Sequence, residues 1–275
     1  MTVAVGVLAL QGAFLEHLVL LRKAATQLQA HAQSQSRPTD TFIFTEVRNV
    51  NQLARCDALI IPGGESTTIS FVAAQSGLLE PLRDFVKVSR KPTWGTCAGL
   101  ILLAEAANAT KKGGQELIGG LDVRVNRNHF GRQVESFQAN LDLPFLKGGP
   151  FVSDEPFHGI FIRAPVVEKI LPNVQGVQEG EQRLADTVVA PSKAAKDDRA
   201  RSAMSADVEV MGKLPGRLKN AAARGVDVHA DNETGDIIAV RQGNVFGTSF
   251  HPELTSDTRI HVWWLQQVLN ATARA

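Results

Sequence analysis

Apolar runs alternate with stretches of helical spacing along most of the chain. The first run, residues 3–10, is continuous and rich in β-branched side chains, which is typical of strands buried in parallel sheets. After a turn at 11–12, the spacing of the leucines predicts a helix over 13–30. The apolar face of that helix would carry Leu15, Leu18, Leu21 and Leu28.

The same alternation continues to the end of the chain. Further strands are predicted at 41–47, 58–61, 121–126, 132–139, 157–165, 237–241 and 245–249. Further helices are predicted at 49–55, 69–76, 79–88, 100–107 and 257–271. Apolar strands that alternate with helices predict an α/β fold, in which a mostly parallel central sheet carries helices on both faces.

Three polar stretches interrupt this alternation, at 31–40, 173–207 and 212–230. Within the second, residues 190–205 combine few large apolar side chains with mixed charges, so we expect this segment to bury little surface and to be mobile. Within the third, 213–224 has some helical character. We interpret all three as surface excursions from a single domain over 1–275, because no internal repeat is apparent.

Composition narrows the class of protein. Hydrophobic residues make up 44% of the 275, and a net charge of +1 gives no general attraction to nucleic acid or membranes. Two cysteines, Cys56 and Cys97, are too few for a disulfide framework or a thiolate zinc site. The apolar start lacks a preceding Lys or Arg, and no apolar run is long enough to cross a bilayer. We therefore expect a cytoplasmic protein in a reducing compartment.

A Gly-x-Cys-x-Gly sequence is centred on Cys97, between a short extended run and an apolar helical run. This spacing is typical of a sharp strand-to-helix turn that lifts a nucleophile above the packed layer, as the Gly-x-Ser-x-Gly elbow does. Free amides and the helix dipole at such a turn favour a thiolate. A small cysteine buried in a core turn is the alternative, and this pentapeptide alone does not decide between them.

Among the seven histidines, His251 is distinguished by its context. It follows a predicted strand, and Glu253 stands two residues later. Residues two apart in an extended segment point the same way, so Glu253 is placed to orient the His251 imidazole. A nucleophile needs a base, and the base needs such a partner. A capped turn before the last helix is the alternative interpretation of His-Pro-Glu.

Residues 62–68, Pro-Gly-Gly-Glu-Ser-Thr-Thr, follow another predicted strand and form a nest of backbone donors. The lysine of a phosphate loop is missing, and an ordinary strand–turn–helix connection is the plain alternative. If the strands are parallel, this nest, Cys97 and His251 converge at their carboxyl ends. The amides near Gly64 and at Ala98 would then form an oxyanion hole for acyl transfer.

Taken together, these segments resemble the class I (triad) glutamine amidotransferases and, within that class, the glutaminase subunits of pyridoxal 5′-phosphate synthase. The resemblance covers most of the chain apart from the three polar stretches, and it implies a flavodoxin-like three-layer sandwich. The Gly-Gly-Glu-Ser-Thr and Phe-Ile-Arg-Ala-Pro segments are its most specific parts. The matching segments are 6–12, 62–68, 95–100, 127–133, 161–165 and 249–254.

The resemblance also implies roles for individual residues. Cys97 would be the nucleophile, His251 its base and Glu253 the acid that orients the base. An arginine and backbone amides suit the free α-carboxylate of a glutamine substrate. The residues implied to line the glutamine site are Gly64, Glu65, Ser66, Arg127, Ile162 and Arg163. No role is implied for His129.

The family's partner follows from the same resemblance. L-glutamine would be hydrolysed to glutamate, and the ammonia would pass to a (β/α)₈-barrel synthase, with no metal or cofactor in the glutaminase. Gln11 and the first helix, with Glu16 and His17, would lie near the partner surface. A cysteine peptidase of related architecture and a non-catalytic binding subunit are the two alternatives; the glutamine-site segments disfavour the first and the intact Cys97, His251 and Glu253 the second.

Overall fold

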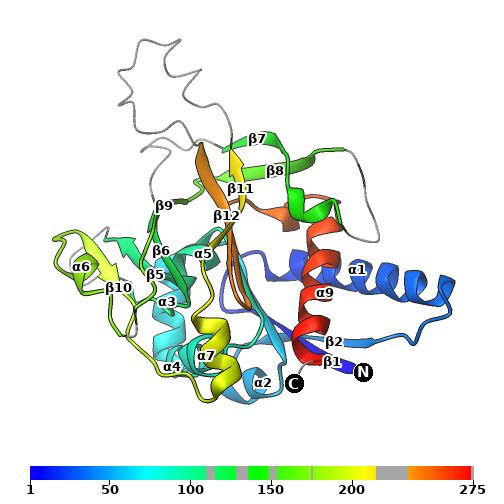
Figure 1. Cartoon of the computed structure of the whole chain (residues 1–275), viewed down its shortest axis with the longest axis horizontal. Helices are drawn as coiled ribbons and strands as arrows, with labels where there is room; N and C mark the ends of the chain where they lie inside the picture. The colour runs from blue at the N-terminus through cyan, green and yellow to red at the C-terminus, as the bar shows by residue number, and fades with distance from the viewer. Residues whose placement is uncertain are drawn as a thin grey trace, which may run out of the picture.

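One large sheet organises the structure, a computed structural model that describes residues 1–109, 115–127, 136–148, 153, 155–174, 176–214 and 235–273 (Figure 1). The strands lie in the order β10-β5-β6-β9-β12-β13-β4-β3-β1-β2, and β11 pairs with β12. Their bounds are β1 Thr2–Leu8, β2 Thr41–Val47, β3 Ala58–Ile61, β4 Thr93–Thr96, β5 Ala104–Asn108, β6 Leu121–Asn126, β9 Val166–Ile170, β10 Thr187–Val189, β11 Glu209–Leu214, β12 Asp236–Gln242 and β13 Val245–Thr248.

The half of the sheet from β2 to β13 is parallel throughout. Of these strands, β1, β3 and β13 are mostly apolar and buried because both of their faces are covered, whereas the edge strand β2 leaves Ile43 54% exposed. Beyond β13, the strands β12 and β9 run antiparallel, and β5 and β6 form a further parallel pair. The carboxyl ends of β3, β4 and β13 therefore meet at one edge, which is the edge where the sequence places its candidate chemistry.

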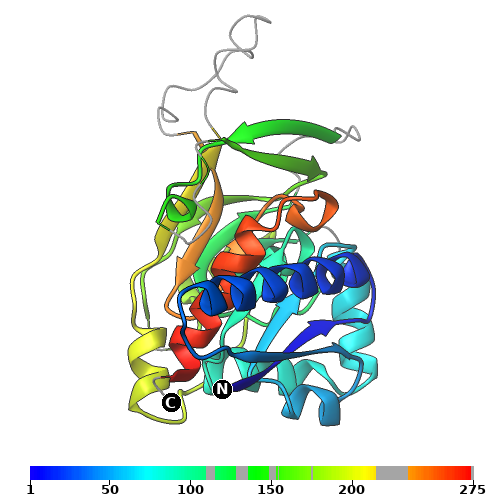
Figure 2. The ribbon, with the colours of Figure 1, turned by 90° about the vertical axis from the view of Figure 1, so that its right-hand side faces the viewer.

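Helices cover both faces of this sheet, which confirms the predicted α/β sandwich. On one face α1 (Phe14–Ser34) packs against α9 (Arg259–Ala273), as Figure 2 shows. Val5, Ile60 and Trp94 point into the core beneath this helix pair. Leu59 and Ile61 point to the opposite core, because side chains alternate along a strand. The helices of that second face are α2 (Val50–Ala54), α3 (Ser66–Gln75), α4 (Leu79–Arg83), which continues as a π-turn over Asp84–Val88, and α5 (Ala98–Leu103).

A separate two-stranded sheet, β7 (Ser136–Leu141) and β8 (Phe157–Ile162), stands beside the main one. Phe137 and Phe161 stack at 4.6 Å between ring centroids and hold the pair together. β8 ends at Ile162 rather than at 165, and β7 starts at Ser136. Residues 132–135 of the predicted strand lie outside the described residues.

The predicted helix over 100–107 is wrong in its second half. α5 runs from Ala98 to Leu103, and the chain then enters β5 at Ala104. Ala-Glu-Ala-Ala-Asn favours a helix locally, but pairing with β6 on one side and β10 on the other imposes the extended form. Tertiary contacts therefore override local propensity here.

The first helix also differs from its prediction. α1 continues to Ser34, so residues 31–34 belong to the helix and not to a loop. Leu15 is 55% exposed, whereas His17 is fully buried. The expectation that His17 lies near a partner surface is therefore wrong, because its ring points between α1 and the sheet; Glu16 is exposed.

The polar stretch 173–207 was predicted as a surface excursion, and most of 190–205 is indeed exposed or half-buried, but the stretch also has regular structure. It contains α6 (Glu179–Gln182), β10 and α7 (Asp198–Met204). β10 pairs with β5, and α7 packs on the π-turn, so this stretch covers one end of the sheet. Of the third stretch, β11 includes Gly212–Leu214, and residues 215–230 lie outside the described residues.

Candidate functional site

Cys97 sits on a strained elbow between β4 and α5. Its backbone has φ +48° and ψ −100°, a region that a non-glycine residue rarely adopts. A Cβ on Gly95 would lie 2.4 Å from the carbonyl carbon of Gly99, and one on Gly99 would lie 2.0 Å from the Ile61 carbonyl oxygen. Both glycines are therefore required for strand, elbow and helix to approach so closely. The backbone at Cys97 therefore has the sharp strand-to-helix turn that was predicted for a nucleophile elbow.

His251 reaches the same edge from the end of β13. β13 runs parallel to β4 with Thr248 opposite Thr96, so the residues that follow each strand emerge side by side. The His251 amide donates to the Ile160 carbonyl oxygen at 2.8 Å, which fixes the turn against β8. Cys97 is one of the neighbours that raise the pKa of His251, so the two side chains lie next to each other.

Glu253 orients the His251 ring. The Glu253 Oε1 lies 2.7 Å from His251 Nδ1, and the carboxylate is buried. Burial, the largest single influence, lowers the pKa of His251, but hydrogen bonds to Cys97 and Glu253 and their negative charges outweigh it and raise the pKa to about 10. His251 therefore carries a proton at neutral pH, beside the Cys97 side chain. This combination is typical of enzymes that transfer an acyl group through a cysteine.

The glycine loop after β3 closes against these side chains. A Cβ on Gly63 would lie 2.3 Å from His251 Cε1, so this glycine lets the loop touch the imidazole. A Cβ on Gly64 would lie 2.4 Å from Gln11 Oε1, which accepts the Glu65 amide at 2.8 Å. Ala98 is the first residue of α5, where backbone amides lack partners within the helix. The loop lies against His251, and α5 starts directly after Cys97; the oxyanion role of Gly64 and Ala98 stays a prediction.

Glu65 has a structural task of its own. Its side chain caps α3 and accepts from the Thr67 amide at 3.2 Å and the Thr68 amide at 2.6 Å. Burial alone would raise the pKa of this carboxyl, but the bonds to Thr68 and Thr67 lower it below its ordinary value. The carboxylate is therefore committed to the helix, and any contact of Glu65 with a substrate would come from its backbone.

Arg127 and Ser66 meet on one side of the loop. Arg127 Nη2 donates to Ser66 Oγ at 2.9 Å and to Thr67 Oγ1 at 3.1 Å. Burial lowers the pKa of Arg127, and the charge of Glu65 offsets part of this effect. Ser66 in turn donates to Gln115 Oε1 at 2.9 Å. Gln115 is a neighbour that the sequence did not single out, because its partners lie about fifty residues away and no local pattern marks it.

Ile162 and Arg163 approach from β8. The Ile162 carbonyl oxygen lies 3.9 Å from Cys97 Sγ, and Arg163 has a left-handed φ of +45°. A left-handed arginine is uncommon and marks a turn held by its surroundings. Ile162 thus contacts the elbow directly, whereas Ser66 and Arg127 contact each other at the start of α3.

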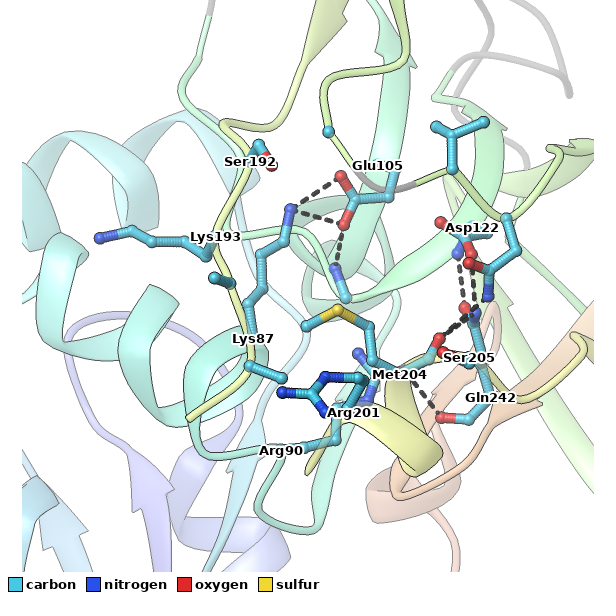
Figure 3. Close-up of a pocket in the computed structure, with 16 residues that line it drawn as sticks. Lys87, Arg90, Glu105, Asp122, Ser192, Lys193, Arg201, Met204, Ser205 and Gln242 are labelled. Atoms are coloured by element: carbon cyan, nitrogen blue, oxygen red, sulfur yellow. Dashed lines mark hydrogen bonds and ion pairs between the residues drawn. The ribbon is translucent and has the colours of Figure 1, made fainter. Parts of the chain in front are cut away.

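A cavity of about 290 Å³ lies away from the elbow, toward the other end of the sheet (Figure 3). Both of its carboxylates have partners: Lys87 Nζ lies 2.7 Å from Oε1 of the buried Glu105, and Gln242 Nε2 donates to the half-buried Asp122 at 2.7 Å. Arg90 donates to the Gln242 carbonyl oxygen at 3.0 Å. Segments of 173–207 form the outer wall. We therefore interpret the cavity as space left between the stretch 173–207 and the end of the sheet on which it packs.

Two negative findings concern the described part of the chain. No group of three or more His, Cys, Asp or Glu side chains there is arranged to hold a metal ion. No helix within the same described ranges is long and apolar enough to cross a membrane.

Comparison with known proteins agrees with the geometry. The model of the SNO glutamine amidotransferase family matches residues 7–196 and 214–270. A relative from Arabidopsis thaliana, described as a probable pyridoxal 5′-phosphate synthase subunit PDX2, is 41% identical over 265 residues, covering 95% of this chain and 84% of that protein. The pyridoxal 5′-phosphate synthase subunit PdxT of Streptomyces avermitilis is 38% identical, covering 97% and 94%.

A solved structure supports the same assignment. It is described as a glutamine amidotransferase, is 32% identical, and superposes with a TM-score of 0.61 over 96% of this chain and 98% of that one. The fold and the cysteine-centred site thus define a class of acyl-transfer enzymes. The chain belongs to the SNO glutamine amidotransferase family, and it is an enzyme of that kind.

Proposed function

We propose that this enzyme is the glutaminase subunit of a pyridoxal 5′-phosphate synthase and hydrolyses L-glutamine with Cys97, His251 and Glu253. The observation that carries the proposal is the His251 imidazole, which has Cys97 as a neighbour and lies 2.7 Å from Glu253 Oε1. The synthase assignment rests on relatives that bear that name and span almost the whole chain.

In the first half-reaction, the Cys97 thiolate attacks the side-chain amide carbon of glutamine, and the carbonyl oxygen takes up the negative charge. Amides at Ala98 and near Gly64 donate to that oxygen; one such donor typically contributes about 100- to 1000-fold in rate. The His251 imidazolium gives its proton to the amide nitrogen, the C–N bond breaks, and ammonia leaves a glutamyl thioester on Cys97.

In the second half-reaction, the neutral His251 removes a proton from water, and the hydroxide attacks the thioester carbon. Collapse of the second tetrahedral species expels the Cys97 thiolate and releases glutamate, while His251 keeps the proton. The Cys97 thiolate and the His251 imidazolium are thereby restored without any external acid or oxidant. Glu253 holds the ring in one orientation through both steps.

Glutamine itself is held beside Cys97 by groups that suit a free amino acid. Arg127, already partnered by Ser66, faces the α-carboxylate, and the turn at Ile162–Arg163 offers backbone groups on the other side. Gly64 and Glu65 contribute their backbone. Ammonia is then passed to a (β/α)₈-barrel synthase, which is the partner, and the enzyme acts in the cytoplasm, where its two free thiols stay reduced.

The test is release of glutamate and ammonia from glutamine, measured with and without the barrel synthase. We expect turnover to rise when the synthase is present, and Cys97→Ala to abolish it while the two proteins still co-purify. Cys56→Ala is the matched control: burial raises the pKa of that thiol to about 11, so it is inert and its loss should leave turnover intact. Ammonia release by Cys97→Ala would show that the nucleophile is another residue. Turnover of peptides or esters without glutamine turnover would show a peptidase.

A further inference from the structure

Two buried histidines lie behind the Glu253 carboxylate, one on each helix of the α1–α9 pair. His17, from α1, has its Nε2 3.4 Å from Glu253 Oε2 and 3.2 Å from Thr96 Oγ1. Its Nδ1 lies 3.0 Å from Nε2 of His261, from α9. Both rings are fully buried, and Trp94 packs edge-on against each. Neither histidine belongs to the three residues that the mechanism above uses.

The hydrogen-bond partners of His17 and His261 favour one of two possible sets of ring tautomers. If His17 carries its proton on Nδ1, it donates to His261 Nε2, and His261 must then carry an Nδ1–H. The His261 Nδ1 is buried without a hydrogen-bond partner, so that proton would be an unsatisfied buried donor. The His17 Nε2 lone pair would also face the negative Glu253 oxygen.

The other set has no such conflict. With both protons on Nε2, His261 donates to His17 Nδ1, and His17 donates toward Glu253 Oε2 and Thr96 Oγ1. The lone pair of His261 Nδ1 then lacks a partner, which costs less than an orphaned N–H. Glu253 Oε2, which makes no hydrogen bond in the structure, has the His17 N–H as its neighbour at 3.4 Å. Both rings are neutral in this arrangement. Burial first, and then the charges of His261 and His251, hold the pKa of His17 well below its ordinary value, and burial lowers that of His261 to about 3.

We propose that His17 is a positioning residue of the active site, which holds Glu253 through its second oxygen so that the first oxygen stays on His251. His261 sets the tautomer of His17 and so acts one step further back. The inference rests on the proposed roles of Cys97, His251 and Glu253. The Glu253 carboxylate then lies between two imidazoles: Oε1 is hydrogen-bonded to His251 Nδ1 at 2.7 Å, and Oε2 is in longer electrostatic contact with His17 Nε2 at 3.4 Å.

The arrangement explains why a polar ring occupies an apolar helix face. His17 lies beside Leu18 and one turn before Leu21, on the buried and otherwise mostly apolar side of α1. An uncharged N–H donor offers a carboxylate a hydrogen bond without adding a buried positive charge that would compete with His251. A neutral histidine is therefore suited to this place, whereas lysine or arginine is not.

The first experiment compares His17→Leu and His17→Gln in the complex with the synthase partner. Leucine keeps the bulk and removes the donor, and we expect kcat to fall roughly 10- to 100-fold with KM little changed, because a displaced Glu253 misaligns the base. Glutamine returns an N–H near the position of Nε2, and we expect it to restore most of kcat. The alkaline limb of the pH–rate profile should move to lower pH in His17→Leu alone. His158→Leu, at an exposed histidine on β8, is the matched control and should behave as wild type.

A second measurement is independent of activity. Nitrogen-15 chemical shifts of the imidazoles, taken across about pH 5.5–8.5, should show His17 and His261 neutral with their protons on Nε2. An Nδ1–H tautomer on His17, or wild-type kcat and pH profile in a folded His17→Leu, would overturn the inference. Equal loss in His17→Leu and His17→Gln would overturn it too. If Glu253→Gln and Cys97→Ala retain full activity, the proposed function itself fails; if both lose activity while His17→Leu does not, only this inference fails.

Discussion

Gly63→Ala tests the placement of the catalytic imidazole with a single methyl group. The added Cβ would lie 2.3 Å from His251 Cε1 and 2.7 Å from Nδ1, whereas ordinary carbon contacts lie at about 3.5–4.0 Å. The ring must therefore move by about 1 Å or more, and its 2.7 Å bond to Glu253 would lengthen beyond about 3.5 Å, the outer limit of a hydrogen bond. A displacement of this size typically lowers the rate about 100-fold.

The added methyl group should have only a small effect on the free energy of unfolding. Overpacking at one site destabilises a protein by about 1–3 kcal/mol, which lowers Tm by several degrees in a chain of this size. The assay is glutamate release in the presence of the synthase, beside a thermal melt. Gly180→Ala is the control, because a Cβ there has no neighbour within 4 Å. Wild-type turnover by Gly63→Ala would refute the reasoning, since His251 would then tolerate a contact that the geometry forbids.

Three further outcomes are expected. Glu253→Gln removes one of the charges that raise the pKa of His251 to about 10, so the imidazolium should lose its proton at lower pH. The pH–rate profile should be level between about pH 7 and 9 in the wild type and should decline across the same range in Glu253→Gln. Arg127→Met should raise KM for glutamine about 10- to 100-fold with a smaller change in kcat, measured by steady-state kinetics; an unchanged KM would remove Arg127 from the binding site. Lys87→Met leaves Glu105, whose pKa is already raised by burial, without its cation. Urea unfolding should show a loss of about 3–5 kcal/mol at neutral pH that shrinks on acidification, as Glu105 takes up a proton; a loss that grows on acidification would contradict this.

The central sheet and the elbow could be predicted because their signals are local. Continuous apolar runs marked the parallel strands, and the glycines around Cys97 marked the sharp turn that the structure has. His251 was found because it follows directly on β13, and the parallel register of β13 with β4 brings it to the elbow. Chain order and sheet topology together were sufficient for this part of the site.

What the sequence did not indicate depends on contacts between distant residues. His17 and His261 are 244 positions apart, and nothing near either one shows that the rings meet. Gln115 reaches Ser66 in the same nonlocal way. The strand β5 has a helix-like sequence and is extended only because other strands pair with both of its edges. In each case the deciding partner is supplied by the tertiary fold.

The stretch 173–207 has a consequence for anyone who shortens this chain. Its three-residue strand β10 occupies the outer edge of β5, and the Pro191 carbonyl oxygen accepts from Lys87 Nζ at 2.7 Å. Removing the stretch would expose the unpaired backbone N–H and C=O groups of β5, with which another molecule could form strand pairs. It would also expose the Lys87–Glu105 ion pair to water. A trimmed version would therefore tend to aggregate even though its catalytic edge is untouched.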